Sequence, residues 1–255
     1  MHPIVITRVA EQQWHAVEDD QVVGRGDTSR RPDGRIFLSI DSWHDAVFDQ
    51  LADTMLADLP RPLYTVVDEA DLDLTSCWQR AGFTTRRREW EYLVPTEPRV
   101  TGLGSVLSPE GVTIVPVGAA QEGPLREVYN TIRDEVDATV GWESMPAEVL
   151  DRPDGTPLLD PSKYAVAAQS DRYVGLVRVA GRVTRQPRIG LLAVLSDHRR
   201  RGIARALLAH VLGSLHRSGV ETASAEVNES NGAAMALFEG VGARRTSSNL
   251  ELVLR

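Results

Sequence analysis

The stretch "LLAVLSDHRRRGIARALL" (Leu191–Leu208) decides the fold of the second half of this 255-residue chain. It begins with a nearly continuous apolar run, which is typical of a central strand buried on both faces. After Gly202 the apolar side chains recur at helical spacing. A strand that passes through a short loop into a helix leaves free backbone N–H groups at the helix start, and these groups suit a diphosphate.

The end of the connection between this strand and helix, together with the first helical turn, residues 199–205, is called the arginine loop below. Gly202 removes a Cβ where a phosphate must approach the backbone, and Ala204 keeps the next contact small. The cationic donors of the loop are Arg199, Arg200, Arg201 and Arg205. Positive side chains in a first helical turn oppose the helix dipole, and a bound anion would offset them. The alternative is a helix whose basic first turn is simply solvated.

Regular elements are predicted on both sides of the arginine loop. Asn231 is placed to cap a helix that Gly240 and Gly242 end, and Gly219 is placed to end the helix that starts after Gly202. The strand patterns are 112–117, 164–170, 173–179, 189–195, 221–227 and 250–255, and the helical patterns are 122–136, 203–215 and a short one near 146–150. This order predicts one mixed sheet with helices on both faces.

Two motifs together resemble the GNAT acetyltransferase superfamily. Arg199-x-x-Gly202-x-Ala204 after an apolar strand is similar to the signature (Q/R)-x-x-G-x-(G/A), and "AEVNESNGAAMALFEGVGA" (Ala225–Ala243) resembles the second conserved block. The resemblance covers residues 111–255 and looks closest to the ribosomal-protein alanine acetyltransferases. It implies acetyl-CoA as cosubstrate and direct transfer of the acetyl group to a primary amine in a ternary complex. The acceptor would be a small molecule or a peptide N-terminus.

The same resemblance implies the site residues. A splayed central strand would pair with the pantetheine arm, the arginine loop would hold the pyrophosphate, and Asn231 would contact the cofactor. The implied cofactor residues are Leu192, Ala193, Val194, Arg199, Arg200, Arg201, Gly202, Ile203, Ala204, Arg205, Asn231 and Phe238. Glu226 matches the position of the catalytic base in the alanine acetylases; a surface salt bridge is the alternative. Phe238 stands where many relatives have a tyrosine that protonates the leaving thiolate, so the general acid is left open.

An acidic and aromatic segment follows the helix at 122–136. In GNAT proteins this region borders the acceptor site, so Trp142 and Glu143 are candidate substrate residues. A cationic amine could pack against Trp142 and pair with Glu143. The alternative is a solvated helix end.

The first half repeats the layout of the second conserved block in "PLYTVVDEADLDLTSCWQRAGFTTRRREWEYLVP" (Pro62–Pro95). Asp71 corresponds to Asn231, Trp78 to Phe238 and Val66 to Glu226, but "SIDSWHDA" has neither the arginine nor the glycine of the arginine loop. We therefore expect an α/β (α+β) protein of two GNAT-like lobes, each with a mixed central sheet flanked by helices. The expected division is a degenerate lobe at 1–98, a linker at 99–110 and an acetyltransferase domain at 111–255. An unrelated α/β packing domain is the alternative for the first half.

Composition excludes several classes of function. The net charge of −8 argues against nonspecific nucleic-acid binding, and no stretch has the roughly 20 apolar residues of a membrane-spanning helix. One cysteine, Cys77, and no evident secretory signal predict a cytoplasmic protein. The six histidines form no metal-binding motif, so no metal is expected. Two other functions stay open, an acyl-CoA-binding regulatory or scaffold protein without turnover and an enzyme for a bulkier acyl-CoA; the oligomeric state is not predicted.

Overall fold

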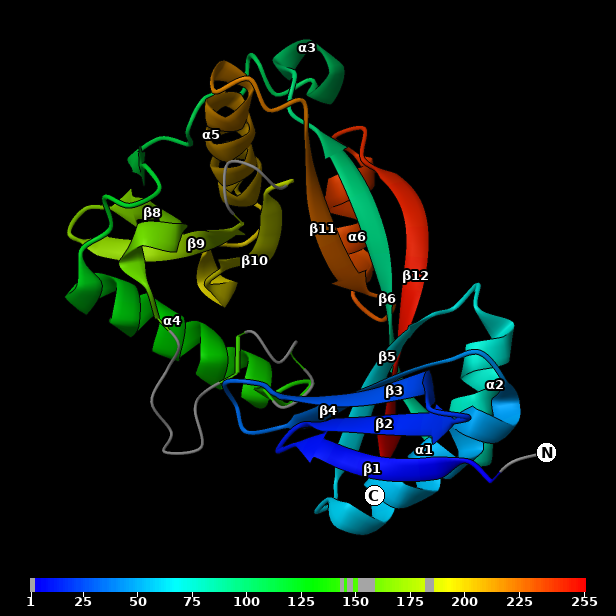
Figure 1. Cartoon of the computed structure of the whole chain (residues 1–255). Helices are drawn as coiled ribbons and strands as arrows, with labels where there is room; N and C mark the ends of the chain where they lie inside the picture. Colours follow the sequence, from blue (N-terminus) through cyan, green and yellow to red (C-terminus); the bar gives the residue numbers. More distant parts are fainter. Residues whose placement is uncertain (1–2, 143–144, 146–148, 151–158, 182–185) are drawn as a thin grey trace. The chain divides into compact units, whose positions relative to one another are not determined.

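The computed structural model describes residues 3–142, 145, 149–150, 159–181 and 186–255 (Figure 1). The chain forms two compact units. The first comprises Met1–Glu89, Arg152–Gly155 and Ser247–Arg255, and the second comprises Trp90–Asp151 and Thr156–Thr246. The helices are α1 (Asp45–Asp58), α2 (Leu72–Arg80), α3 (Pro98–Thr101), α4 (Glu122–Asp137), α5 (Ile203–Arg217) and α6 (Gly232–Glu239). The strands are β1 (Val5–Ala10), β2 (Gln13–Glu18), β3 (Gln21–Arg30), β4 (Ile36–Ser42), β5 (Leu63–Asp68), β6 (Thr84–Pro95), β7 (Val112–Val115), β8 (Tyr164–Gln169), β9 (Arg172–Ala180), β10 (Arg188–Val194), β11 (Thr222–Asn228) and β12 (Arg244–Leu254).

The sheet of the first unit has the strand order β1-β2-β3-β4-β5-β12. Its first four strands are antiparallel, β4 and β5 are parallel, and β5 and β12 are antiparallel. Helix α1 packs on β2, β3 and β4. The close approach explains a glycine of β3, because a Cβ added to Gly24 would lie 2.7 Å from Val47 Cγ1 of α1. Aromatic rings of Phe48, Trp78 and Phe83 meet edge to face in the core of this unit.

The sheet of the second unit has the order β6-β11-β10-β9-β8-β7. Strands β10 and β11 are parallel, whereas β7 to β10 pair with one another in antiparallel fashion. Helix α4 contacts β9, and α5 contacts β7, β8, β9 and β10 (Figure 1). A mixed sheet with helices on it is the predicted architecture of this half, and the structure confirms it.

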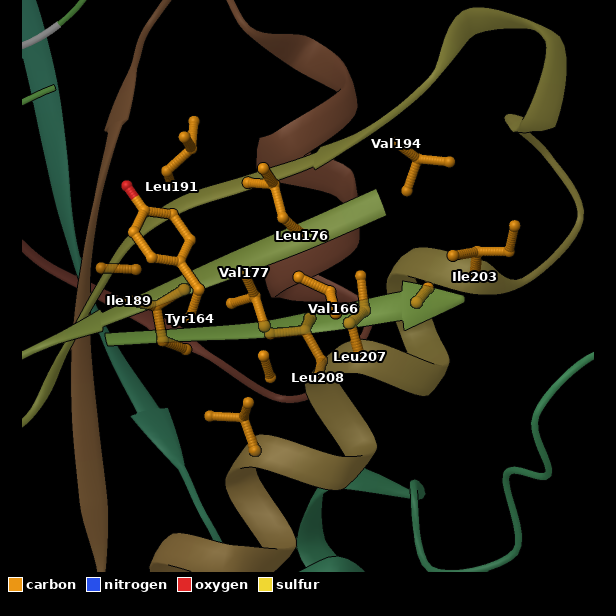
Figure 2. Close-up of a cluster of buried hydrophobic side chains, with 14 of the residues drawn as sticks. Tyr164, Val166, Leu176, Val177, Ile189, Leu191, Val194, Ile203, Leu207 and Leu208 are labelled. Carbon is orange, nitrogen blue, oxygen red and sulfur yellow. The ribbon is translucent and has the colours of Figure 1, made fainter. Parts of the chain in front are cut away.

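Helix α5 is held to the sheet by the apolar stripe that predicts it. Its buried residues are Ile203, Ala206, Leu207, Leu208, Val211 and Leu212. Figure 2 shows Ile203, Leu207 and Leu208 beside side chains of β8, β9 and β10. The helix ends at Arg217, followed by Gly219 at a φ of +80°, as the sequence predicts. Because buried leucines fix the helix, its N-terminus is held at the end of β10.

The unit boundaries differ from the predicted division at 1–98, 99–110 and 111–255. The predicted linker is packed structure: α3 begins at Pro98, and Leu103 is buried in the core of the second unit. The last strand is longer than predicted, and its residues Asn249–Leu254 pair with β5 of the first unit. The short helix predicted near 146–150 and the candidate residue Glu143 lie largely or wholly outside the described residues.

Candidate functional site

Strand β10 separates from β11 just before the arginine loop. The two strands pair at two positions, Arg188 with Ser224 and Ile189 with Ala225. The register of β10 on β9 then shifts between Ile189 and Leu191, which makes Gly190 a bulge. Beyond the bulge β10 pairs with β9 alone as far as Val194, and Figure 1 shows it turning away from β11. This edge of β10 can therefore take an added extended chain.

The predicted pantetheine residues lie on this separated part of β10. Leu192 and Ala193 are half-buried and Val194 is buried. The Val194 carbonyl already accepts a hydrogen bond of 3.0 Å from the Nε of Arg199. Main-chain pairing with an added chain would therefore rest mainly on Leu192 and Ala193.

The backbone of the arginine loop is left-handed at two residues. A 3₁₀ turn at Ser196–His198 leads into the loop, where Arg200 has a φ of +63° and Gly202 a φ of +84°. A left-handed conformation costs an ordinary residue about 1–2 kcal/mol, so Arg200 marks stored strain. The first helical hydrogen bond runs from Ala206 N to Gly202 O. The N–H groups of residues 203–205 precede it and lie at the positive end of the helix.

The Arg199 side chain, although 55% exposed, ties the loop to α4 and to the end of β10. Besides its bond to Val194, its Nη2 donates to Glu135 Oε2 of α4 over 2.9 Å. The same carboxylate accepts hydrogen bonds from Ser196 N and Ser196 Oγ. Arg200, Arg201 and Arg205 have exposed side chains. Arg199 is exposed as well, so its bonds to Val194 and Glu135 are what set it apart from the other three arginines.

Glu226 lies on β11, and the two strand neighbours on either side of it are buried. Its Oε2 lies 2.8 Å from Arg188 Nη2, and both side chains are about a quarter exposed (26%). The salt bridge that the sequence leaves as an alternative is therefore present. Glu226 is nevertheless beside the point where β10 and β11 separate, because Ile189 and Ala225 form the last pair.

Asn231 caps α6 as predicted, since its Oδ1 accepts a hydrogen bond of 3.0 Å from Ala234 N. The cap leaves the amide nitrogen of Asn231 for a ligand. Phe238 is buried and stacks on Tyr92, with ring centroids 6.0 Å apart. The Tyr92 hydroxyl donates to Glu239 Oε1, and burial raises the pKa of Tyr92 above its usual value. Phe238 is thus a core residue in this structure.

Trp142 does not offer an open face for a cation. Its side chain is 5% exposed and meets Tyr129 edge to face at 5.7 Å. Tyr129 in turn donates to the Val149 carbonyl. The end of α4 itself is solvated, since Asp134 and residues 137–140 are exposed, whereas Trp142 packs in the core. An acceptor amine packed flat on Trp142 would require this core to open.

The first unit repeats the local geometry of the second without its loop. Asp71 caps α2 through Leu74 N over 2.9 Å, as Asn231 caps α6. Strands β4 and β5 also pair at two positions only. The Thr65 hydroxyl, however, donates to the Leu38 carbonyl across this pair, and Val66 stands in place of Glu226. The Leu38 carbonyl at this edge of β4 is therefore already hydrogen-bonded to a side chain of the first unit.

Comparisons with known proteins agree with this geometry. Residues 155–252 match the family model described as an acetyltransferase (GNAT) domain. This part of the chain is a GNAT acetyltransferase domain. The [ribosomal protein bS18]-alanine N-acetyltransferase of Escherichia coli K12 is 47% identical over 51 residues, which is 20% of this chain. The match spans 34% of that relative's length.

Solved structures show the GNAT fold over nearly the whole chain. A GCN5-related N-acetyltransferase from Sphaerobacter thermophilus has a TM-score of 0.63 at 16% identity and covers 97% of this chain and 82% of its own. A tandem GNAT protein from the clavulanic acid biosynthesis pathway has a TM-score of 0.65 at 13% identity, and the alignment covers 95% of this chain and 82% of that protein. The prediction of two GNAT-like lobes is therefore confirmed, with a first lobe that lacks the arginine loop.

Three positions matter that the sequence did not single out for a site. Glu135 fixes the loop from 61 and 64 residues away, and local sequence carries no signal of that contact. Gly190 interrupts an apolar run, and an isolated glycine within a strand pattern is a sequence signal for a bulge. Arg178 reaches over that bulge. Within the described residues no cluster of His, Cys, Asp and Glu could hold a metal ion, and none of the helices has the length and apolarity to cross a bilayer.

Proposed function

We propose that this protein is an acetyl-CoA-dependent N-acetyltransferase that transfers an acetyl group to a primary amine directly, in a ternary complex. The observation that carries the proposal is the separation of β10 from β11 immediately before a left-handed glycine and a helix N-terminus. An extended arm and a diphosphate on one molecule need these two features at consecutive positions. Coenzyme A has that chemistry.

The described residues fit this cosubstrate. Leu192 and Ala193 offer an unpaired strand edge for the pantetheine amides. The N–H groups of residues 203–205, with exposed Arg200, Arg201 and Arg205, would hold the pyrophosphate. Asn231 lies at the start of α6, where its amide nitrogen can donate to the arm. When bound, acetyl-CoA would supply a thioester carbonyl for attack.

Residues of the chain would then accept the proton of the amine and stabilise the negative charge that develops on the carbonyl oxygen. An amine attacks only in its neutral form, so the Glu226 carboxylate would accept a proton from the ammonium group, directly or through water. Arg188 holds the Glu226 side chain in place through an ion pair of 2.8 Å. Backbone N–H groups on the free edge of β10 would stabilise negative charge on the carbonyl oxygen. A thiol has an ordinary pKa of about 8.5, so the sulfur can leave without a tyrosine at position 238.

Binding and turnover are tested separately. Acetyl-CoA and desulfo-CoA should each raise the thermal unfolding temperature, since a ligand at 100 times its Kd stabilises the folded state by about 2.7 kcal/mol. Stabilisation by neither compound would exclude the site. Release of free thiol with a panel of amines then tests transfer. Binding without thiol release would favour an acyl-CoA-binding regulatory protein, which the buried Phe238 and the paired Glu226 also allow.

Glu135→Ala should weaken acetyl-CoA binding by about tenfold, because Ser196 and Arg199 lose a charged partner worth about 1.5–3 kcal/mol. Titration calorimetry measures the change in Kd. Glu127→Ala is the matched control, since Glu127 is an exposed residue of the same helix. Equal affinities of both variants for acetyl-CoA would show that the anchor does not position the loop.

A further inference from the structure

A cluster of three charged residues lies on one face of the second unit's sheet. Arg178 is on β9, Arg188 on β10 and Glu226 on β11. Arg188 pairs in register with Ala180, and side chains two residues apart share a face, so Arg178 and Arg188 point the same way. Glu226 joins them through its ion pair with Arg188. The face is the one turned away from α5, because Gly175, which points to the other face, lies against Ile203 of α5.

Arg178 is placed at the point where transfer would occur. A Cβ added to Gly190 would lie 2.9 Å from Arg178 Nη1, so the guanidinium extends over the bulge of β10. On the other side of the bulge, Glu226 follows Ala225, the last residue of β11 that pairs with β10. Gly190 therefore has Arg178 on one side and Glu226 on the other. Two strand spacings separate their backbones by about 10 Å.

The charges of this cluster do not cancel. Glu226 is matched by Arg188, whereas Arg178 makes no ion pair in the part of the chain that the structure describes. The Asp160 carboxylate, which precedes β8, is bound to Ser162 and Lys163. Arg178 is half-buried, and a partly desolvated guanidinium favours an anionic partner.

We propose that the acceptor is an amine that carries a carboxylate in the same molecule, an amino acid or a close analogue. The inference rests on the proposed acetyltransferase function and names the substrate class of that site. The planar fork of Arg178 would bind the carboxylate through two parallel hydrogen bonds. The same molecule's amino group would then face Glu226. A peptide N-terminus offers an amide at the place of this carboxylate and would leave Arg178 without its partner.

Matched acceptors test the carboxylate directly. L-Alanine and L-phenylalanine are compared with L-alaninamide and L-phenylalaninamide, and rates are expressed per neutral amine because the amides lose their proton more easily. Wild type should favour the acids in kcat/KM by about tenfold or more, the equivalent of about 1.4 kcal/mol. Arg178→Gln should remove this preference by raising KM for the acids alone. Arg178→Lys should restore part of it.

Arg172→Gln serves as the control, because Arg172 is an exposed arginine at the start of the same strand. Acetyl-CoA affinity and the unfolding temperature are measured for every variant. Three results would overturn the carboxylate proposal and leave acetyl transfer intact. Wild type could use acids and amides equally, it could use amides or peptides alone, or Arg178→Gln could keep the wild-type preference for acids. A wild-type protein that binds no acetyl-CoA would overturn the proposed function instead. If Arg178→Gln fails to fold, the proposal is tested by the ratio of kcat/KM for acids to kcat/KM for amides, compared between wild type and Arg178→Lys.

Discussion

Gly202→Asp is expected to weaken acetyl-CoA binding by about 100-fold or more. The variant puts a carboxylate at the residue that caps the N-terminus of α5, beside the proposed pyrophosphate. Two unit charges about 4 Å apart near a protein surface interact by about 4 kcal/mol, and every 1.4 kcal/mol changes Kd tenfold. The substitution also adds a side chain to a residue with a φ of +84°. Titration calorimetry measures the loss.

A second glycine, which follows the other end of α5, serves as a control that separates the effect of charge at the site from the effect of backbone strain. Gly219 follows the C-terminal end of α5 with a φ of +80°, and among the described residues no atom beyond its chain neighbours lies within 4 Å of a Cβ added there. An added Cβ at Gly202 would likewise meet only Pro109 Cγ, at an ordinary 3.8 Å. Both aspartate variants should therefore fold with similar losses of stability, about 1–2 kcal/mol each. Only Gly202→Asp should lose the thermal stabilisation by acetyl-CoA; retention of it would place the pyrophosphate elsewhere.

The local geometry of this loop is accessible from sequence because short-range physics fixes it. A glycine between an apolar strand and an amphipathic helix predicts the start of α5, and the structure adds that this glycine is left-handed. The caps at Asn231 and Asp71 follow in the same way, since each bonds an N–H three residues ahead. Helix α4 also agrees closely with its predicted range. These features depend on neighbours within one or two helical turns.

Long-range pairing is what the sequence does not show. The pattern of the last strand predicts a strand, but nothing local says that its end pairs with β5 in the first unit. The three antiparallel strands that begin the first unit carry glycines and charged residues, and they were not predicted. Trp142 follows an acidic helix end and suggested an exposed acceptor residue, yet its contact with Tyr129 buries it. The support of Arg199 by Glu135 is missed for the same reason.

Glu226→Gln is expected to lower kcat by about 10²–10⁴-fold, the usual contribution of a general base, and to leave acetyl-CoA affinity unchanged. Glutamine has the same shape, and its amide oxygen can still accept a hydrogen bond from Arg188. The variant therefore avoids the loss that an unpaired, partly buried arginine would cause. What it removes is the capacity to take a proton from the amine. The pH profile of kcat should lose the limb that this carboxylate produces.

Glu239→Gln is the matched control for this variant. Glu239 also pairs with an arginine, Arg245, over 2.6 Å, but it lies at the far end of α6 from the Asn231 cap. Hydrogen bonds from Tyr92 and Arg245 hold the pKa of Glu239 below its usual value, so it is an ionised carboxylate of similar setting. Its loss should change unfolding temperature slightly and kcat hardly at all. If Glu226→Gln retained wild-type kcat and pH dependence, the ion pair with Arg188 would be the whole role of Glu226, and another group would have to take the proton.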